Sequence, residues 1–82
     1  MLLIELLDRA GREGAVVVLK IDGQRDRRRW TVVVSHAEPE LAHRGDFERV
    51  DQAVDHLRTW LAQLPGDWSW LDEPVEDLDL LG

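Results

Sequence analysis

Two β-branched runs, separated by eight residues, constrain the fold more than any other feature of the sequence. Residues 15–21 read AVVVLKI and residues 30–35 read WTVVVS. Residues of this kind favour strands, and both runs are too short for a stable helix. The intervening segment, 22–29, is polar, begins Asp-Gly and carries four arginines, which favours a tight antiparallel connection. The two runs therefore predict a two-stranded antiparallel hairpin with a charged tip.

Side chains alternate along a strand, and in this hairpin both faces carry apolar residues. In the first strand, Val16 and Val18 lie opposite the face formed by Ala15, Val17, Leu19 and Ile21. Because a single layer of helices covers only one face, either helices flank both faces or a second copy of the chain covers one. A lone two-stranded ribbon is also marginal in water and has two open edges. We therefore expect the hairpin edge to be available for extension, through a homodimer or a partner strand.

A long amphipathic helix is predicted after the hairpin. Large apolar residues recur there in steps of three and four, the spacing of one helix face: Phe47, Val50, Val54, Leu57, Leu61 and Leu64. Asp46 precedes this pattern as an N-cap, and Pro65 with Gly66 ends it. Residues 36–45, which include Pro39 and Gly45, are expected to form the connecting loop.

The two ends of the chain complete the predicted fold. Apolar residues at positions 2, 3, 4, 6 and 7 predict a short helix that stops at Gly11, with a strand as the alternative. Residues 67–82 form an acidic, Trp-rich C-terminal segment, expected to be either a short helix or an ordered extension. The prediction is thus one α+β domain, 1–82: a short N-terminal helix, a two-stranded antiparallel hairpin, a long amphipathic helix and an acidic C-terminal segment.

The charge is unevenly distributed along the chain. Of a formal net charge of -7, the last sixteen residues contribute -6, whereas residues 20–29 sum to +3. Negative charge repels phosphate backbones and anionic lipid, so we expect neither direct nucleic-acid binding nor a membrane partner. A basic protein is the expected partner.

Composition removes several classes of function. The absence of cysteine excludes disulfides, thiol nucleophiles and cysteine-ligated metals, and it fits a cytoplasmic protein. The apolar start, residues 1–7, is too short for a signal peptide core or a membrane span. His36, His43 and His56 have no recognisable ligand spacing and are expected to be solvated. No hydroxyl residue stands in a nucleophile motif. We therefore expect no enzyme, catalytic residue, metal or cofactor.

The acidic residues form the candidate binding site. Glu48, Asp51 and Asp55 fall on one side of the predicted helix, and more acids follow in the C-terminal segment. Two such rows of carboxylates mimic the charge of a phosphate backbone, and tryptophans beside them are typical interface anchors. The candidate partner-binding residues are Glu48, Asp51, Asp55, Trp68, Trp70, Asp72, Glu73, Glu76, Asp77 and Asp79. The alternative is a solvated surface with the tryptophans in the core.

Across residues 14–64, the order VVVLKIDGQ, an Arg-rich turn, WTVVVS and FERVDQAVDHLRTWL resembles small acidic immunity proteins of bacterial polymorphic toxin systems. The resemblance implies an inhibitor that binds one cognate toxin, often a nuclease. No motif carries a functional residue of that family onto this chain. Phage-encoded anti-CRISPR inhibitors are equally small, acidic and poor in motifs.

The sequence therefore predicts an acidic protein inhibitor that neutralises a basic, nucleic-acid-acting protein. Its partner would be a nuclease toxin or a nucleoprotein defence complex. The alternative is a homo-oligomerising structural domain with no inhibitory role, whose acids serve solubility.

Overall fold

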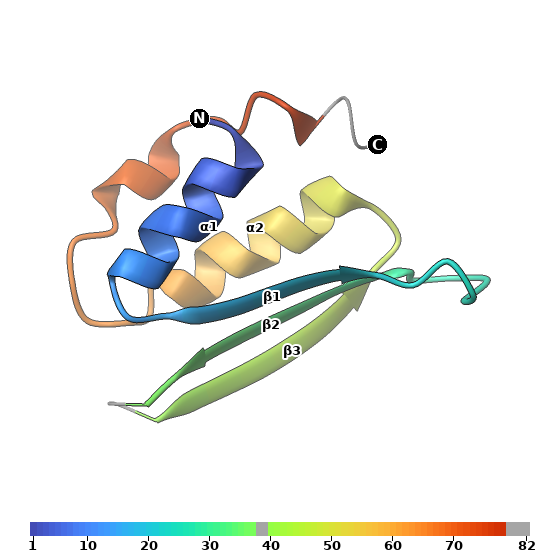
Figure 1. The fold of residues 1–82 in the computed structure, drawn as a ribbon, viewed down its shortest axis with the longest axis horizontal. Coiled ribbons are helices and arrows are strands. Elements are labelled where there is room, and N and C mark those ends of the chain that lie inside the picture. The colour runs from blue at the N-terminus through green and yellow to red at the C-terminus, as the bar shows by residue number, and fades with distance from the viewer. Residues whose placement is uncertain (38–39, 79–82) are drawn as a thin grey trace.

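The computed structural model describes residues 1–37 and 40–78, which form two helices packed on one face of a three-stranded antiparallel sheet (Figure 1). The elements, in chain order, are α1 Leu3–Arg12, β1 Val16–Ile21, β2 Trp30–His36, β3 Leu41–Phe47, α2 Val50–Leu61 and a 3-10 turn, η1, Ser69–Asp72. The strands pair in the order β1-β2-β3. The mixed helix and antiparallel-sheet class is confirmed, and the hairpin lies where the two β-branched runs predict it.

The prediction of only two strands was wrong, because part of the expected loop 36–45 is a third strand. β3 pairs with β2 in a register that places Val34 opposite His43 and Val32 opposite Gly45. Its side chains alternate between half-buried and exposed. The half-buried positions include a histidine and a glycine, so the strand lacks the β-branched run that makes β1 and β2 recognisable.

The start of the long helix also differs from the prediction. Asp46 and Phe47 belong to β3, and α2 begins at Val50 with Arg49 as its N-cap residue. The Arg49 backbone N–H donates to Gln52 Oε1 at 3.1 Å, which satisfies one amide at the helix start. Glu48 consequently precedes the helix and does not lie on its face.

The first helix is confirmed, but its end lies at Arg12, since Gly11 is inside it. The terminating residue is Gly14, whose φ of +91° suits glycine. The Gly14 N–H donates to Gly11 O at 3.0 Å and the Ala15 N–H donates to Ala10 O at 3.2 Å. These two bonds form a Schellman motif, which satisfies carbonyls at the end of α1.

The core lies between the helices and one sheet face. α2 packs over β2 and β3, and α1 packs over β1. The largest fully buried side chains are Leu6, Val32, Val34, Val50, Val54, Leu57 and Leu61. The opposite face has no helix over it in the described residues, and Val16 and Val18 are 59% and 47% exposed there.

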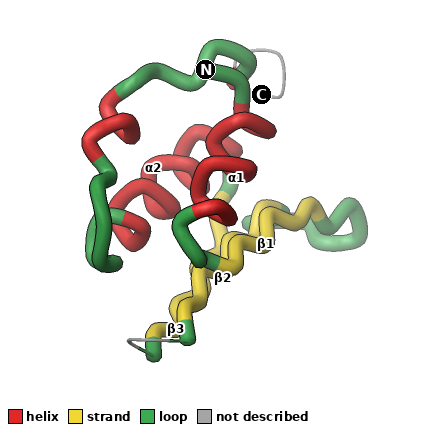
Figure 2. The backbone as a smooth tube through the Cα atoms, turned by 60° about the vertical axis from the view of Figure 1, so that its left-hand side comes forward, coloured by secondary structure: helices red, strands yellow, loops and turns green. Residues whose placement is uncertain are grey.

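The connection 22–29 between β1 and β2 projects beyond the helical layer (Figure 2). At the other end of the chain, the segment after η1 turns back toward the start of α1. The Glu76 N–H donates to Met1 O at 2.9 Å. The C-terminal segment was predicted to be either a short helix or an ordered extension. The structure has the short turn η1, followed by extended backbone at Glu73, and residues 79–82 lie outside the described part.

Candidate acidic binding surface

The predicted acids divide into three groups, of which the first surrounds the start of α2. Glu48 Oε1 lies 3.8 Å from Arg27 Nε in the hairpin tip. Asp51 receives two hydrogen bonds from the Arg49 guanidinium, at 3.0 and 3.1 Å, which lower the pKa of the Asp51 carboxyl. Both carboxylates therefore have an arginine beside them, which offsets part of their charge.

The second group connects α2 to η1 through Arg58. Arg58 Nη1 lies 3.9 Å from Asp55 Oδ1, and Arg58 Nη2 donates to the Glu73 carbonyl at 3.2 Å. Asp55 is 77% exposed, whereas Arg58 is 27% exposed, so the carboxylate faces solvent and the guanidinium lies beneath it. Asp72 is exposed at the end of η1, next to Glu73. Arg58 thus links Asp55 of α2 to the backbone of Glu73, whereas the Glu73 carboxylate lies 3.9 Å from Arg9 Nη1 of α1.

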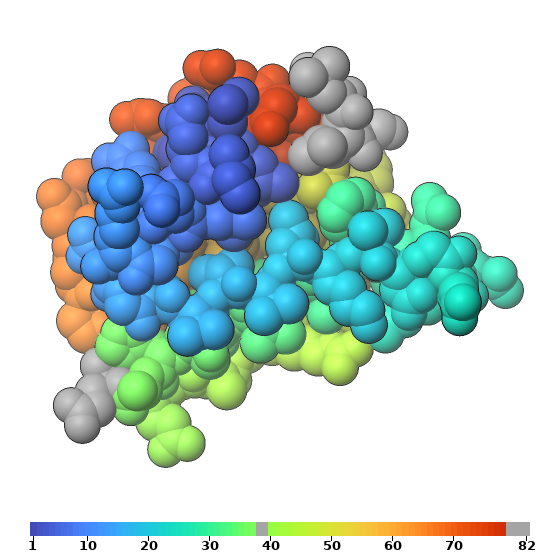
Figure 3. Space-filling view, viewed as in Figure 1, coloured from blue at the N-terminus to red at the C-terminus, as the bar shows by residue number. Residues whose placement is uncertain are grey.

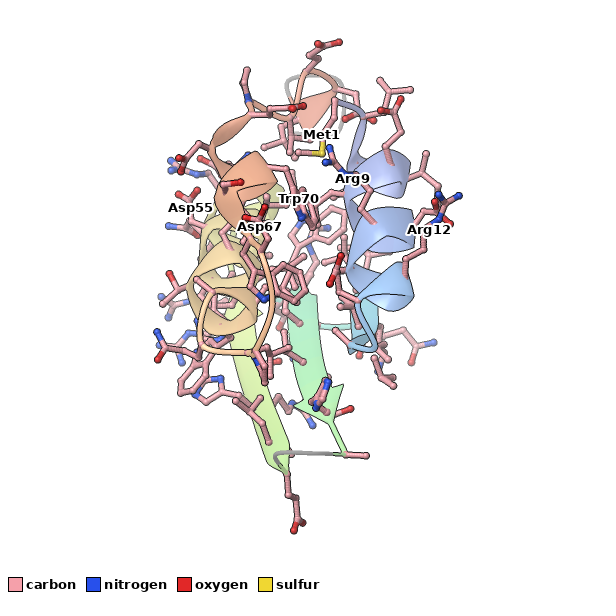
Figure 4. All side chains as sticks on the ribbon, turned by 90° about the vertical axis from the view of Figure 1, so that its left-hand side faces the viewer. Met1, Arg9, Arg12, Asp55, Asp67 and Trp70 are labelled. Carbon is pink, nitrogen blue, oxygen red and sulfur yellow. The ribbon has the colours of Figure 1, made fainter. Side chains whose placement is uncertain are left out.

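The two tryptophans have different environments. Trp68 is buried, 8% exposed, and its Nε1 donates to Leu64 O at 3.0 Å. Trp68 is therefore a core residue and offers no surface anchor. Trp70 is half-buried, its ring centroid lies 5.6 Å from that of Trp68, and the Arg9 guanidinium carbon lies 4.4 Å from it. Figure 4 shows Arg9 reaching from α1 toward Trp70, with Asp55 on the outer side of α2.

The third group of predicted acids holds the C-terminal segment against α1. Asp77 Oδ1 accepts a hydrogen bond from the Leu3 backbone N–H at 2.9 Å. Leu2, the N-cap residue, provides no side-chain cap of its own, so Asp77 supplies a carboxylate at the positive end of the helix dipole. Glu76 Oε1 lies 3.4 Å from the Met1 nitrogen and is 70% exposed. Asp79 lies outside the described residues.

Asp67, which was not among the predicted site residues, lies just before η1. Its Oδ1 accepts a hydrogen bond from the Ser69 backbone N–H at 3.0 Å, and this bonding lowers the pKa of the Asp67 carboxyl. The Asp-Trp-Ser spacing before the turn is typical of an Asx turn and could have identified it. We call Asp55, Arg58, Asp67, Trp70, Asp72 and Glu73 the η1 acidic surface.

Two histidines form a separate cluster that contradicts the expectation of solvated side chains. His56 Nε2 lies 2.9 Å from His43 Nδ1, and the His43 ring stacks on Trp60 with centroids 3.8 Å apart. Phe47 covers His56 at a centroid distance of 4.9 Å. Burial, followed by the proximity of His43, lowers the pKa of His56. Within 1–37 and 40–78, no three His, Asp or Glu side chains are grouped as a metal site would require.

No family model, no curated protein and no solved structure matches this chain. None of the helices in the described part of the chain has the length and apolar content needed to cross a membrane.

Proposed function

We propose that this chain is a small acidic inhibitor that binds and neutralises a basic, nucleic-acid-acting protein in the cytoplasm. An immunity protein that blocks a nuclease toxin, or an anti-CRISPR-type inhibitor of a nucleoprotein complex, would act in this way. The observation that carries the proposal is the η1 acidic surface, in which three carboxylates lie within three residues of the half-buried Trp70 in the chain, and Arg58 links this segment to a fourth, Asp55, on α2. A groove that binds phosphate attracts such an array by the same Coulomb and counterion effects that hold nucleic acid.

Internal contacts hold this surface in place, which reduces the entropy lost on binding. Arg58 bridges α2 to the Glu73 backbone, and the Ser69 amide fixes the Asp67 carboxylate. Trp70 is confined by Arg9 on one side and by Trp68 on the other. Preorganised groups of this kind gain affinity because fewer rotamers must be frozen in the complex.

The remaining predicted acids have secondary roles in this proposal. Glu48 and Asp51 would extend the negative surface along α2 toward the hairpin tip, with their charge partly offset by Arg27 and Arg49. Asp77 acts indirectly, because it fastens the segment that carries η1 to the start of α1. Neither a catalytic residue nor a metal or cofactor enters the proposed mechanism.

The test compares two baits that have lost the same charge from different surfaces. One triple variant carries Asp55→Asn, Asp72→Asn and Glu73→Gln, and its control carries Asp8→Asn, Glu13→Gln and Asp26→Asn. Both changes remove three negative charges, so differences in binding report location and not net charge. Wild-type protein and both variants are used to capture proteins from bacterial lysates that contain candidate toxins and defence complexes, and the activity of each captured protein is then assayed.

We expect wild type and the control to retain a nucleic-acid-acting protein and to inhibit it, with association that slows as salt rises. The η1 variant should lose at least about tenfold in association rate. Equal retention by the two variants, or binding without inhibition, would contradict the proposal.

A further inference from the structure

β1 is an edge strand whose free backbone groups belong to apolar residues. The Asp22 N–H donates to Arg29 O at 2.8 Å, and these residues lie opposite one another in the register that pairs Ile21 with Trp30. Hydrogen-bonded and non-hydrogen-bonded pairs alternate along an antiparallel ladder. The even-numbered residues of β1 therefore bond to β2, and the amides and carbonyls of Val17, Leu19 and Ile21 point away from the sheet.

The exposed large apolar side chains lie on α1 and β1, with Val16 and Val18 on the face of β1 that points away from the helices. Within the described residues, those most exposed are Leu2 at 42%, Ile4 at 68%, Val16 at 59%, Val18 at 47% and Ile21 at 51%. All of them lie in α1, in the residue just before it, or in β1. Figure 3 shows α1 and β1 side by side on one face of the molecule. Exposed apolar side chains along an edge strand favour contact with another strand.

Charge identifies a second copy of this chain as the occupant. Residues 1–29 carry seven bases and five acids, whereas residues 30–82 carry three bases and twelve acids. The net charge is therefore +2 for residues 1–29 and -9 for residues 30–82, so two copies repel one another less at the β1 side than at the η1 acidic surface. The exposed face of α1 has Glu5 near its start and Arg12 at its end. In an antiparallel arrangement, Arg12 of each copy faces the acidic start of the other helix, so the surface is complementary to itself.

We infer that β1 pairs antiparallel with β1 of a second copy, with Leu19 opposite Leu19, to form a six-stranded sheet across a twofold axis. In this register Val17 lies opposite Ile21 of the other copy, so that their outward amides and carbonyls can hydrogen-bond to one another. It also covers the exposed Ile21 side chain with Val17 of the second copy, on the face that carries the helices. A twofold contact of this kind is closed, so assembly stops at the dimer.

The inference is independent of the proposed function. α2 packs over β2 and β3, away from the β1 edge, so the η1 acidic surface remains free in both copies. Its test uses the purified chain without any partner. A dimer with no inhibitory activity and a monomeric inhibitor are therefore separate, distinguishable outcomes.

Sedimentation equilibrium from about 1 μM to about 1 mM provides the first test. Ile21→Lys places a charge at the β1 edge, and Ala42→Lys is its matched control at the exposed β3 edge. Both substitutions reduce the net negative charge equally, so general repulsion cannot explain a weaker dimer. We expect a wild-type dimer whose dissociation constant rises at least about tenfold in Ile21→Lys and is unchanged in Ala42→Lys. A monomer at every concentration, or equal effects of the two variants, would overturn the inference.

A crosslink tests the register. The chain has no cysteine, so Leu19→Cys introduces one thiol per copy. Directly opposite residues in a hydrogen-bonded pair have Cα atoms about 5.5 Å apart, within the range of about 4.4–6.8 Å for disulfides. Lys20→Cys is the control, since residue 20 does not face itself in this register. We expect Leu19→Cys to oxidise to a covalent dimer much faster than Lys20→Cys. Equal rates, or faster oxidation of Lys20→Cys, would overturn the register.

Discussion

The two edges of the sheet are built from different residues, although both strands pair with β2. Along β1 the free backbone groups belong to Val17, Leu19 and Ile21, and the only charge is Lys20. Along β3 they belong to Ala42, Arg44 and Asp46, with a glycine between the two charged residues. Charged side chains on an edge strand disfavour pairing with another strand, whereas apolar side chains favour it. The residues of the β3 edge are therefore suited to end the sheet, whereas those of the β1 edge are suited to the pairing that we propose.

Asp46 shows how firmly the charge of the β3 edge is maintained. Its carboxylate accepts a hydrogen bond from the Thr31 hydroxyl and another from Arg25, at 3.1 Å from Nη1, and Arg44 lies 3.5 Å away. The hydrogen bonds from Thr31 and Arg25 lower the pKa of Asp46 to about 2. The carboxylate therefore stays ionised at any pH near neutrality, and this edge remains charged.

The largest expected effect is the stability lost when a leucine is shortened in α2, which packs over β2 and β3, or in α1, which packs over β1. Leu57 of α2 is completely buried, whereas Leu3, the first residue of α1, is 8% exposed. We expect Leu57→Ala to cost about 3–5 kcal/mol and Leu3→Ala about 2–3 kcal/mol, because the less enclosed site relaxes more easily. Urea denaturation measures both. A larger loss for Leu3→Ala would show that the α1 side is the better packed of the two.

Replacement of two glycines by alanine should change the stability of the fold in opposite directions. A Cβ on Gly45 in β3 would lie 2.7 Å from the Phe47 ring and 3.0 Å from His56 Nε2, whereas a Cβ on Gly11 in α1 has nothing within 4 Å. Gly45→Ala should destabilise the fold by about 1–3 kcal/mol through overpacking. Gly11→Ala should stabilise it by about 0.5–1 kcal/mol through helix propensity. Thermal denaturation would contradict this account if both changes acted in the same direction.

Asp77 links the C-terminal segment to the β1 side through the α1 N-terminus. Asp77→Ala removes the hydrogen bond to the Leu3 amide and should cost about 1 kcal/mol, as expected for loss of a helix cap. Asp72→Ala is the control, because Asp72 is exposed at the end of η1. Chemical denaturation of both variants gives the comparison. Equal losses would show that the Asp77 carboxylate does not cap α1.

The smallest expected effect is a pH dependence confined to the β3 side. Because the pKa of His56 is lowered in the folded protein, the unfolded chain binds protons more readily as pH falls through about 6.5. Stability contributed by neutral His56 should therefore decrease between about pH 7.5 and about pH 5.5, while carboxylates remain ionised. His56→Gln should reduce this dependence in urea titrations. An unchanged pH dependence in that variant would assign it to other groups.

Local signals made the hairpin and most of α2 predictable, because β-branched runs and a repeat of three and four residues depend only on neighbouring positions. β3 was missed because His43, Gly45 and charged residues lack those signals. The Asp77 cap could not be predicted, since it joins residues 74 positions apart. Nor could the sequence place Trp68 in the core and leave Trp70 half-buried, because both flank Ser69 and their burial is decided by tertiary packing.

Amide hydrogen exchange at the two edges distinguishes a β1 strand paired with a second copy from one that is open to solvent. Among the described residues, no strand pairs with the amides of Val17, Leu19 and Ile21, or with those of Ala42, Arg44 and Asp46. As protein concentration rises, the account predicts that exchange slows at the three β1 amides and stays fast at the three β3 amides. Fast exchange at all six amides at every concentration, or protection that develops at β3, would contradict it.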